Sequence, residues 1–312
     1  MDKLAVFTGN AHPQLAKAIC RCLKIKLSEA MVAKFSEGEI RVKIDDNVRG
    51  KDVFIVQPTC PPSNDTLMEL LIMIDAIKRA SANRITAVMP YFGYARQDRK
   101  DQPRVPITAK LVANLLTVAG ANRVLTMDLH AGQIQGFFDI PLDHLFSVGV
   151  FIEYIEKLKL KNLVVVSPDV GGIKMARAYA KRLSAGLAII DKRRFSPDQT
   201  EVMHLLGEVE NKNAIIVDDL IATGGSLIEA VEALKKAKAK TVRAAISHGV
   251  LSGQAIANID KCKGLEELLI TDSIPLENHK KHSRIKVLSI AELLCEAIKR
   301  IHNEESISSL FD

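Results

Sequence analysis

Short hydrophobic runs alternate with longer amphipathic stretches along almost the whole chain. The short runs are rich in β-branched residues, and the stretches between them place apolar residues at helical spacing. This alternation is typical of an α/β fold with a mainly parallel sheet flanked by helices, because parallel strands need crossover connections. The predicted strands are 4–8, 40–44, 53–56, 85–89, 124–127, 163–166, 187–190, 214–217 and 242–247. The predicted helices are 66–80, 108–119, 171–183 and 225–237.

The two halves of the chain repeat one order of elements. A strand at 53–56, a loop, a helix and a second strand are echoed from residue 214 onward. One interpretation is a duplicated α/β unit that kept a phosphate loop in only the second copy; the alternative is that any two βαβ units look alike at this level. We predict an N-terminal domain at 1–147 and a C-terminal domain at 148–312. The last ten or so residues are expected to pack back on the first domain or on a neighbour.

Composition sets broad limits. A length of 312 residues, 47% of them hydrophobic, suits two packed domains. Only 4% are aromatic, which argues against a base-stacking surface, and the net charge of +6 is spread along the chain. The chain begins with a strand pattern in place of a signal peptide, and no apolar run approaches a membrane span. We expect a cytoplasmic protein with small anionic ligands and no nucleic-acid or membrane partner.

The cysteines form an odd set without metal-type spacing beyond one Cys-x-Cys pair. They are Cys20, Cys22, Cys60, Cys262 and Cys295. We expect reduced and mostly buried thiols, as is usual in the cytosol.

The segment 214–226 carries the most specific local chemistry. A buried strand pattern ends in Asp218 and Asp219 and leads through a small-residue loop into a helix. Carboxylates accept hydrogen bonds from ribose hydroxyls, and glycines let the N–H groups at a helix start approach a phosphate closely. The alternative is a helix cap without a ligand. Because a bare cap needs neither an acid pair nor two consecutive glycines, we favour a sugar phosphate.

Two other segments suit a nucleotide. Asp128 and His130 follow a predicted strand end and suit a divalent ion with a triphosphate, although an isolated His at a strand end is more often structural. The polar stretch 97–106 carries Arg99, Lys100 and Arg104 and is either a binding lid or a solvated surface loop.

Together these motifs resemble a known family. The loop after Asp218 and Asp219 is similar to the phosphoribosyl-diphosphate loop of the type I phosphoribosyltransferase fold. The segments 35–39, 90–98, 128–143, 167–172, 191–194 and 303–311 are similar to those of ribose-phosphate diphosphokinase, in the same order. The resemblance covers essentially the whole chain and is strongest to class I, which phosphate activates and ADP inhibits. It implies two tandem type I phosphoribosyltransferase-like domains.

The resemblance implies transfer of the diphosphate of ATP to the C1 hydroxyl of ribose 5-phosphate, with release of AMP. It assigns ATP binding to Phe35, Glu37, Gly38, Glu39, Arg96, Gln97 and Arg99. His130 and Asp169 are implied to hold Mg²⁺, with two ions expected. The stretch 97–106 is implied to be a flap that closes over ATP and excludes water. By sequence alone, Phe35 is equally suited to a hydrophobic core.

The implied ribose 5-phosphate site lies in the second half. Its residues are Arg194, Asp218, Asp219, Ala222, Thr223, Gly224, Gly225 and Ser226. Lys192 and Arg194 are implied to stabilise the transition state, because fixed cations offset the charge of a diphosphoryl group in transfer; a solvated strand end is the alternative. The family usually has an acid in place of Ala222 and Thr in place of Ser226. The flap segment 101–103 is also less basic than in many relatives.

The family further implies regulation and assembly. The residues at matching regulatory positions are Arg49, Ser81, Gln135, Asp143, Ser306 and Ser308. Phosphate is the implied activator, and dimers are expected to assemble into hexamers; a frayed C-terminus is the alternative for the last two residues of the set. Two rival functions stay open: a phosphoribosyltransferase, and a non-catalytic subunit that moderates the synthetase.

Overall fold

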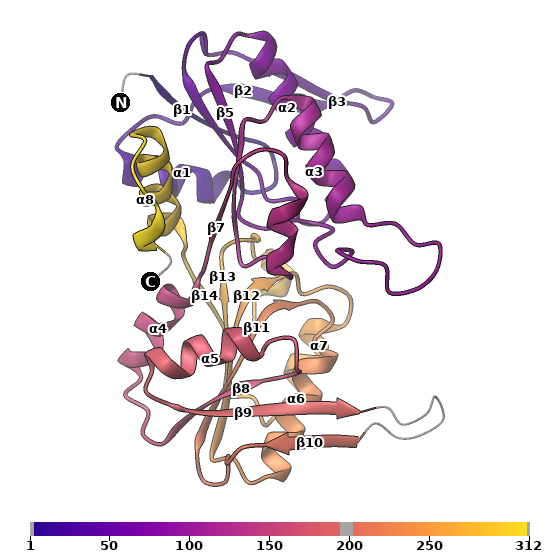
Figure 1. Ribbon diagram of the computed structural model, residues 1–312, viewed down its shortest axis with the longest axis vertical. Coiled ribbons are helices and arrows are strands. Elements are labelled where there is room, and N and C mark those ends of the chain that lie inside the picture. Colours follow the sequence, from indigo (N-terminus) through magenta and orange to yellow (C-terminus); the bar gives the residue numbers. More distant parts are fainter. Residues whose placement is uncertain (1–2, 194–201, 311–312) are drawn as a thin grey trace. The chain divides into compact units, whose positions relative to one another are not determined.

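The chain folds into two compact units, seen here in a computed structural model that describes residues 3–193 and 202–310 (Figure 1). Unit 1 comprises the chain up to Phe146, the short segment Ser273–Pro275 and the chain from Ile290 onward. Unit 2 comprises Ser147–Asp272 and Leu276–Ser289. No helix in these described ranges is both long and apolar enough to cross a membrane.

Unit 1 is built on a five-stranded parallel sheet. The strand order is β1 (Leu4–Thr8), β4 (Asp52–Val56), β5 (Arg84–Met89), β6 (Arg123–Met127) and β7 (Leu142–Leu145). Strands β2 (Ala30–Lys34) and β3 (Ile40–Ile44) form a separate antiparallel hairpin. The helices are α1 (Pro13–Leu23), α2 (Ser63–Arg79), α3 (Thr108–Ala119) and the C-terminal α8 (Ala291–His302), with 3-10 turns at Gly132–Phe137 and Ser308–Leu310.

Unit 2 is built on a seven-stranded sheet. The order is β10 (Val202–Leu206), β9 (Gly186–Arg193), β8 (Leu163–Ser167), β11 (Asn213–Ile221), β12 (Thr241–Gly249), β13 (Glu267–Thr271) and β14 (Ile285–Leu288). Only β10 runs antiparallel to its neighbour. The helices are α4 (Val148–Lys157), α5 (Ile173–Arg182), α6 (Gly225–Lys236) and α7 (Ala255–Lys261), with a 3-10 turn at Asn278–Lys280.

Unit 2 has a buried apolar cluster on each face of its sheet. Val164 and Val166 of β8 face one buried cluster, whereas Val165 between them faces the other. Successive side chains of a strand point to opposite faces, so a sheet with helices on both sides needs apolar residues at every position. The uninterrupted apolar run of this strand is therefore the sequence signal of a central parallel strand, and it confirms the predicted α/β class.

The two units share one topology. In unit 1 the order β1, β4, β5, β6, β7 is all parallel, and in unit 2 the order β8, β11, β12, β13, β14 is likewise all parallel. Each unit also inserts two strands at the same point, β2 and β3 in unit 1 and β9 and β10 in unit 2. Unrelated βαβ pairs would not agree over so many elements, so the topology favours the duplication.

The C-terminal segment packs on unit 1. Cys295 of α8 is joined to Cys22 of α1, and Arg84 donates through Nη2 to the carbonyl oxygen of Ile301 at 2.9 Å. His302 Nδ1 lies 2.9 Å from an Asp52 carboxylate oxygen. The chain from Ile290 thus groups with unit 1, which differs from a single division at 147/148.

The Cys22–Cys295 disulfide corrects the expectation that all five cysteines are reduced. The two Cα atoms lie 6.2 Å apart, within the range that a disulfide spans. Sequence spacing gave no sign of it, because 273 residues separate the partners and only the packing of α8 beside α1 brings them together. Cys20, Cys60 and Cys262 lie outside this bond and are buried, as expected.

Reduction of this disulfide is expected to lower the unfolding temperature by about 5 °C or more, because the bond closes a very long loop in the unfolded chain. Alkylation of the denatured protein should modify three cysteines before reduction and five after it. The Cys22→Ser variant should unfold at the temperature of the reduced protein and should not respond to reductant. Five alkylated cysteines in protein kept from reductants would contradict the assignment.

Candidate functional site

The two adjacent acids of the predicted sugar-phosphate site lie at the carboxyl edge of the unit 2 sheet. Strand β11 pairs with β8 only as far as Ile216, whereas its pairing with β12 continues to Ile221. Asp218 and Asp219 therefore project from β11 beyond the end of its neighbour, with half-buried side chains. Ligands of open α/β sheets bind at this edge, where strand ends leave a crevice.

Negative charge is concentrated at this edge. Burial, and then the neighbouring charge of Asp219, raise the pKa of Asp218 to about 8. Asp169, which follows β8, contributes to the same shift through its charge. The shift joins three carboxylates of unit 2 into one electrostatic cluster, and such a cluster favours a cation or hydroxyl donors.

Asp169 is held by the turn that begins α5. The hydroxyl of Ser167 donates to the carbonyl oxygen of Asp169 at 2.7 Å, and the Gly172 N–H donates to its carboxylate at 2.9 Å. A Cβ at residue 172 would lie 2.8 Å from the Ser167 hydroxyl oxygen, so any larger residue there would displace the Ser167 side chain. The Asp169 side chain is thus positioned by backbone contacts while it stays exposed to solvent.

The loop after Asp219 leads directly into α6. Gly224 takes a φ of 80°, in the left-handed region that favours glycine, and serves as the N-cap of the helix. No side chain caps this end of α6. The first N–H groups of a helix have no partner within the helix, so the loop offers donors and a positive helix end to an anion.

Of the two predicted transition-state cations, one lies on a described strand. The backbone of Lys192 is in β9, where it pairs with Met203 of β10. Arg194 lies outside the described residues. Their assignment stays a prediction.

The predicted adenine-binding residues lie at the tip of the β2–β3 hairpin in unit 1. The Phe35 N–H donates to the Glu39 carbonyl oxygen at 2.8 Å, and Gly38 has a φ of 96° in the turn between them. The Phe35 side chain is 45% exposed, and the Arg41 guanidinium lies 5.5 Å from its ring centroid. The core alternative for Phe35 is therefore wrong, and its ring is accessible to a ligand, as are Glu37 and Glu39.

The first turn of α2 holds both segments predicted to bind ATP. Lys34, at the end of β2, pairs with Asp65 at 2.5 Å. Tyr94, two residues before Arg96, donates its hydroxyl to Asn64. The hairpin and the loop that carries the second set of ATP residues are therefore anchored on one helix end, within one unit.

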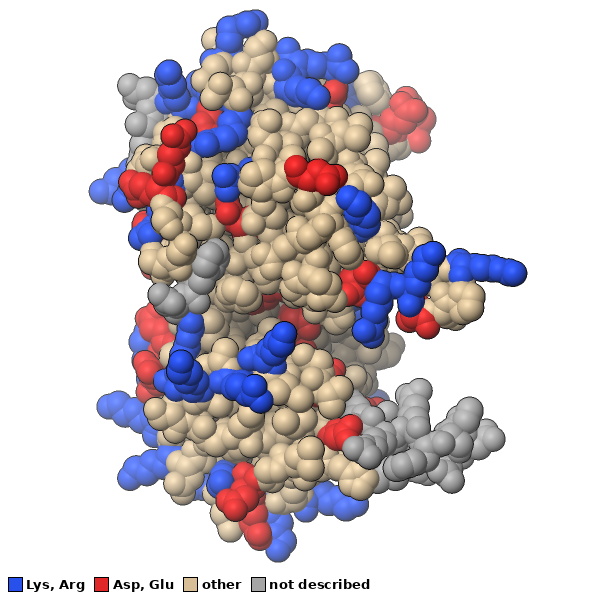
Figure 2. Space-filling view, in the orientation of Figure 1, with Lys and Arg blue, Asp and Glu red and all other residues tan. Residues whose placement is uncertain are grey.

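The predicted flap has neither helix nor strand from Gln97 to the start of α3. Gln97 holds its base, where its carbonyl oxygen accepts from the Ala109 N–H at 3.2 Å. Arg96, Gln97, Arg99, Lys100 and Arg104 are all exposed. Figure 2 shows basic side chains along the loop that protrudes before α3. An extended, exposed and basic loop is what closure over a triphosphate needs.

Asp128 and His130 follow β6 as predicted but differ in exposure. Asp128 is buried with a φ of 40°, and its N–H donates to the Leu145 carbonyl oxygen at 3.0 Å. His130 is exposed in unit 1, whereas Asp169 belongs to unit 2. Within residues 3–193 and 202–310, no group of three or more His, Cys, Asp or Glu side chains is arranged to hold a metal ion. The metal assignment stays a prediction.

Unit 1 fills the position that corresponds to Asp218 with a closed polar network. Gln57 follows β4 and donates through Nε2 to Glu69 of α2 at 2.7 Å. The other carboxylate oxygen of Glu69 accepts from the Asn10 side chain at 2.8 Å. These side chains satisfy one another, so at this position unit 1 has a closed hydrogen-bond network where unit 2 has its acid pair. Sequence reasoning noted Gln57 but missed Glu69 and Asn10.

The predicted regulatory residues lie on unit 1. The Gly50 N–H, next to Arg49, donates to the Ser81 carbonyl oxygen at 2.9 Å. Asp143 pairs with Arg123 at 2.6 Å, and Ser306 donates to Ser308 at 3.1 Å. Gln135 donates to the Gly132 carbonyl oxygen at 2.9 Å. No contact joins all six, so the regulatory site stays a prediction.

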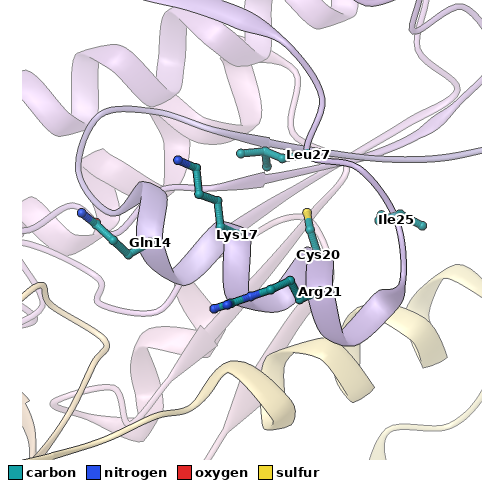
Figure 3. A pocket seen from close by; sticks show the side chains of 6 residues that line it. All are labelled: Gln14, Lys17, Cys20, Arg21, Ile25 and Leu27. Carbon is teal, nitrogen blue, oxygen red and sulfur yellow. The ribbon is translucent and has the colours of Figure 1, made fainter.

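A depression of about 430 Å³ beside α1 contains none of the predicted site residues. Figure 3 shows its lining side chains, Gln14, Lys17, Cys20, Arg21, Ile25 and Leu27. Burial raises the pKa of the Cys20 thiol to about 11, so the thiol stays protonated and unreactive at neutral pH. We assign no chemistry to this depression.

Comparisons with known proteins agree over the full length. Residues 4–120 match the N-terminal domain of ribose phosphate pyrophosphokinase, and residues 191–312 match the phosphoribosyl synthetase-associated domain. The ribose-phosphate pyrophosphokinase of Rhizobium meliloti is 58% identical over 99% of this chain and 100% of its own length. That of Wolinella succinogenes is 54% identical over 98% of each chain. The crystal structure of phosphoribosylpyrophosphate synthetase from Mycobacterium smegmatis superposes with a TM-score of 0.92 and 42% identity, over 97% of this chain and 99% of that one.

The duplicated parallel sheets and the acid-and-glycine loop define an enzyme with type I phosphoribosyltransferase-like units. With relatives above 50% identity over their full length, the chain belongs to the ribose-phosphate pyrophosphokinase family. The predicted family and fold class are confirmed.

The raised pKa of Asp218 makes stability depend on pH. The folded carboxyl keeps its proton up to about pH 8, whereas its ordinary pKa is 3.8, so the folded state binds more protons across this interval. Its contribution to stability is therefore lost as pH rises from about 4 to 8. In the ligand-free and metal-free protein, Asp218→Asn should raise the unfolding temperature, little at pH 4 and most above pH 8.

Calorimetry from pH 4 to 9 measures this difference. The exposed Asp139→Asn serves as a control that removes an acid without a burial effect and should change little at any pH. A gain for Asp218→Asn that is the same at every pH would contradict the assigned cause.

Proposed function

We propose that this chain transfers the diphosphate group of ATP to the C1 hydroxyl of ribose 5-phosphate, giving 5-phosphoribosyl 1-diphosphate and AMP. One observation carries the assignment of the sugar-phosphate site: the pair Asp218 and Asp219 stands directly before the uncapped start of α6. Family membership supports the reaction, since full-length relatives above 50% identity are ribose-phosphate pyrophosphokinases.

A sugar phosphate suits this edge because it has hydrogen-bond donors, its hydroxyls, at one end and an anionic acceptor, its phosphate, at the other. Ribose hydroxyls donate to the carboxylates of Asp218 and Asp219, and each hydrogen bond lessens the repulsion between them. The 5-phosphate accepts from the N–H groups of Thr223, Gly224, Gly225 and Ser226 and from the hydroxyls of Thr223 and Ser226. Ala222 supplies no charge, so the anion meets no nearby acid from the loop itself.

The diphosphate transfer needs cations where negative charge develops. Lys192 and Arg194 are the proposed fixed cations, and Arg99 of the flap adds a third over the triphosphate. Asp169 and His130 are the proposed Mg²⁺ ligands, with two ions expected, and phosphate oxygens and water would supply the other ligands that this hard cation prefers. When bound, Mg²⁺ neutralises phosphate charge and orients the triphosphate.

The adenine end of ATP is proposed to lie at the β2–β3 hairpin. The exposed ring of Phe35 offers a stacking face, and Glu37 and Glu39 offer acceptors for an amino group. Arg96 and Gln97 are proposed to contact the remainder of the nucleotide. Closure of the flap excludes water, so hydrolysis does not compete with transfer.

We also propose that copies of this chain assemble, first as dimers and then as hexamers. In support, α3 exposes an apolar stripe at helical spacing: Leu111, Leu115 and Val118 are 54%, 38% and 78% exposed. A second copy that packs on this stripe would bury it. Regulation at Arg49, Ser81, Gln135, Asp143, Ser306 and Ser308, with phosphate as activator, is part of the same proposal.

A cytoplasmic location is proposed from the metabolic substrates. The Cys22–Cys295 disulfide is the observation that counts against it, because stable disulfides are rare in the cytosol.

The reaction is tested by AMP formation from ATP in Mg²⁺ and phosphate, with and without ribose 5-phosphate. We expect AMP only with the sugar, and one phosphoribosyl diphosphate for each AMP. Folded protein that releases no AMP would overturn the proposal. Consumption of phosphoribosyl diphosphate with a free base would then indicate a phosphoribosyltransferase, and altered activity of an added synthetase would indicate a regulatory subunit.

Lys192→Ala should lower kcat by about 10²-fold or more, because it removes a charge that acts on the transition state. ATP binding measured by calorimetry should stay within about twofold, since the adenine contacts are elsewhere. Lys181→Ala, which removes an exposed cation from α5, is the matched control and should leave kcat unchanged. An unchanged kcat in Lys192→Ala would remove this residue from the catalytic set.

Asp218→Ala should raise the KM for ribose 5-phosphate much more than the KM for ATP, because the proposed contacts of this carboxylate are to the ribose. Initial rates with each substrate varied in turn separate the two constants. Equal changes in both would show that the division into two binding sites is wrong.

A further inference from the structure

The carbonyl groups of the phosphate loop are tied back toward the segment that leads into α7. The Ala222 carbonyl oxygen accepts from the Ser252 N–H at 2.9 Å, and the preceding Ile221 carbonyl accepts from the Leu251 N–H at 3.1 Å. The Thr223 carbonyl oxygen accepts from Nδ2 of Asn258, on α7, at 3.0 Å. Backbone groups hold the first two of these carbonyls, whereas a side chain holds the third.

The direction of each carbonyl fixes the direction of the next N–H. A trans peptide is planar, so its C=O and N–H groups point to opposite sides. The bond from Ser252 therefore turns the Thr223 N–H away from this segment, and the bond from Asn258 does the same for the Gly224 N–H. Two successive N–H groups that point to one side form a concave site for an anion.

The Thr223–Gly224 peptide is the one that most needs such a restraint. Gly224 has a φ of 80°, and a Cβ built on it would make only ordinary van der Waals contact, with the Ala255 carbonyl oxygen 3.8 Å away. A glycine without side-chain packing is free to rotate the adjoining peptide. A rotated peptide would present a carbonyl oxygen to the phosphate, and the repulsion would weaken binding.

We propose that Asn258 is a positioning residue, which fixes the Thr223–Gly224 peptide so that the loop binds the 5-phosphate of the sugar substrate. The inference rests on the proposed function of this loop. Sequence reasoning had no signal for it, because Asn258 lies 35 residues beyond Thr223 on a different helix.

Asn258→Ala should raise the KM for ribose 5-phosphate about 5-fold or more, the usual effect of one lost hydrogen bond, and should leave the KM for ATP within about twofold. Alanine is the better helix former at a half-buried position, so the unfolding temperature should not fall. Asn258→Asp keeps the shape and places a carboxylate against the Thr223 carbonyl oxygen, so its KM for ribose 5-phosphate should rise more than that of Asn258→Ala.

The matched control is Gln254→Ala, which removes a side-chain amide from the N-cap of α7. The Gln254 side chain makes no hydrogen bond with another residue of the described chain, so its KM for either substrate should not change. Calorimetric titration of ribose 5-phosphate in the absence of ATP gives a second readout that does not depend on turnover.

The outcomes distinguish failure of the proposed function from failure of the positioning role of Asn258. Wild-type protein that neither forms AMP nor binds ribose 5-phosphate would overturn the proposed function. Active wild-type protein with both Asn258 variants within twofold of it would overturn the positioning role alone. An equal rise in the KM for ATP, or a rise in Gln254→Ala, would show a general effect of α7 and would likewise overturn it.

Discussion

The accumulation of negative charge at the carboxyl edge of the unit 2 sheet is the constraint on which the site depends. Asp169, Asp218 and Asp219 come together there, and the pKa of Asp218 rises to about 8 because burial, and then the charges of Asp219 and Asp169, disfavour its ionised form. Immediately beyond stands the uncapped start of α6. A ligand with hydroxyls and a cation at one end and a phosphate at the other would relieve both conditions at once, which is the reason for proposing a sugar phosphate at this edge.

Unit 1 shares this topology but has different polar residues at the corresponding strand end. Where unit 2 has an acid pair and a glycine loop, unit 1 has Gln57 bonded to Glu69, and the network closes on itself. The residues proposed to bind ATP lie instead on additions to the shared sheet, the β2–β3 hairpin and the loop before α3. Duplication thus supplied two scaffolds, and the acid pair and the glycine loop stand at the strand end of unit 2.

The C-terminal helix shows how strongly tertiary packing constrains this chain. Asp52 accepts from Arg84 and lies against His302, so a buried charge at the start of β4 depends on the end of α8. The buried acid needs both partners, because an unpaired charge in the interior is costly. The disulfide adds a covalent link to the same contact between α1 and α8. Ser306 and Ser308 follow this anchored helix, and Arg300 of α8 donates to the Ser306 carbonyl oxygen at 3.0 Å.

The sequence alone determined the elements whose signals are local. Every predicted strand lies within an observed strand, and α3 and β3 match the predictions at both ends. Local prediction works for these elements because hydrophobic periodicity is a property of neighbouring residues. The acid pair, the glycine loop and the basic flap were also readable, since their chemistry is contiguous. Only the tertiary structure decided the contacts between distant segments: the Cys22–Cys295 bond, the network around Glu69, and the hydrogen bond from Asn258 to Thr223 in the loop before α6. Pairings of this kind depend on how helices and strands pack, and no spacing along the chain encodes them.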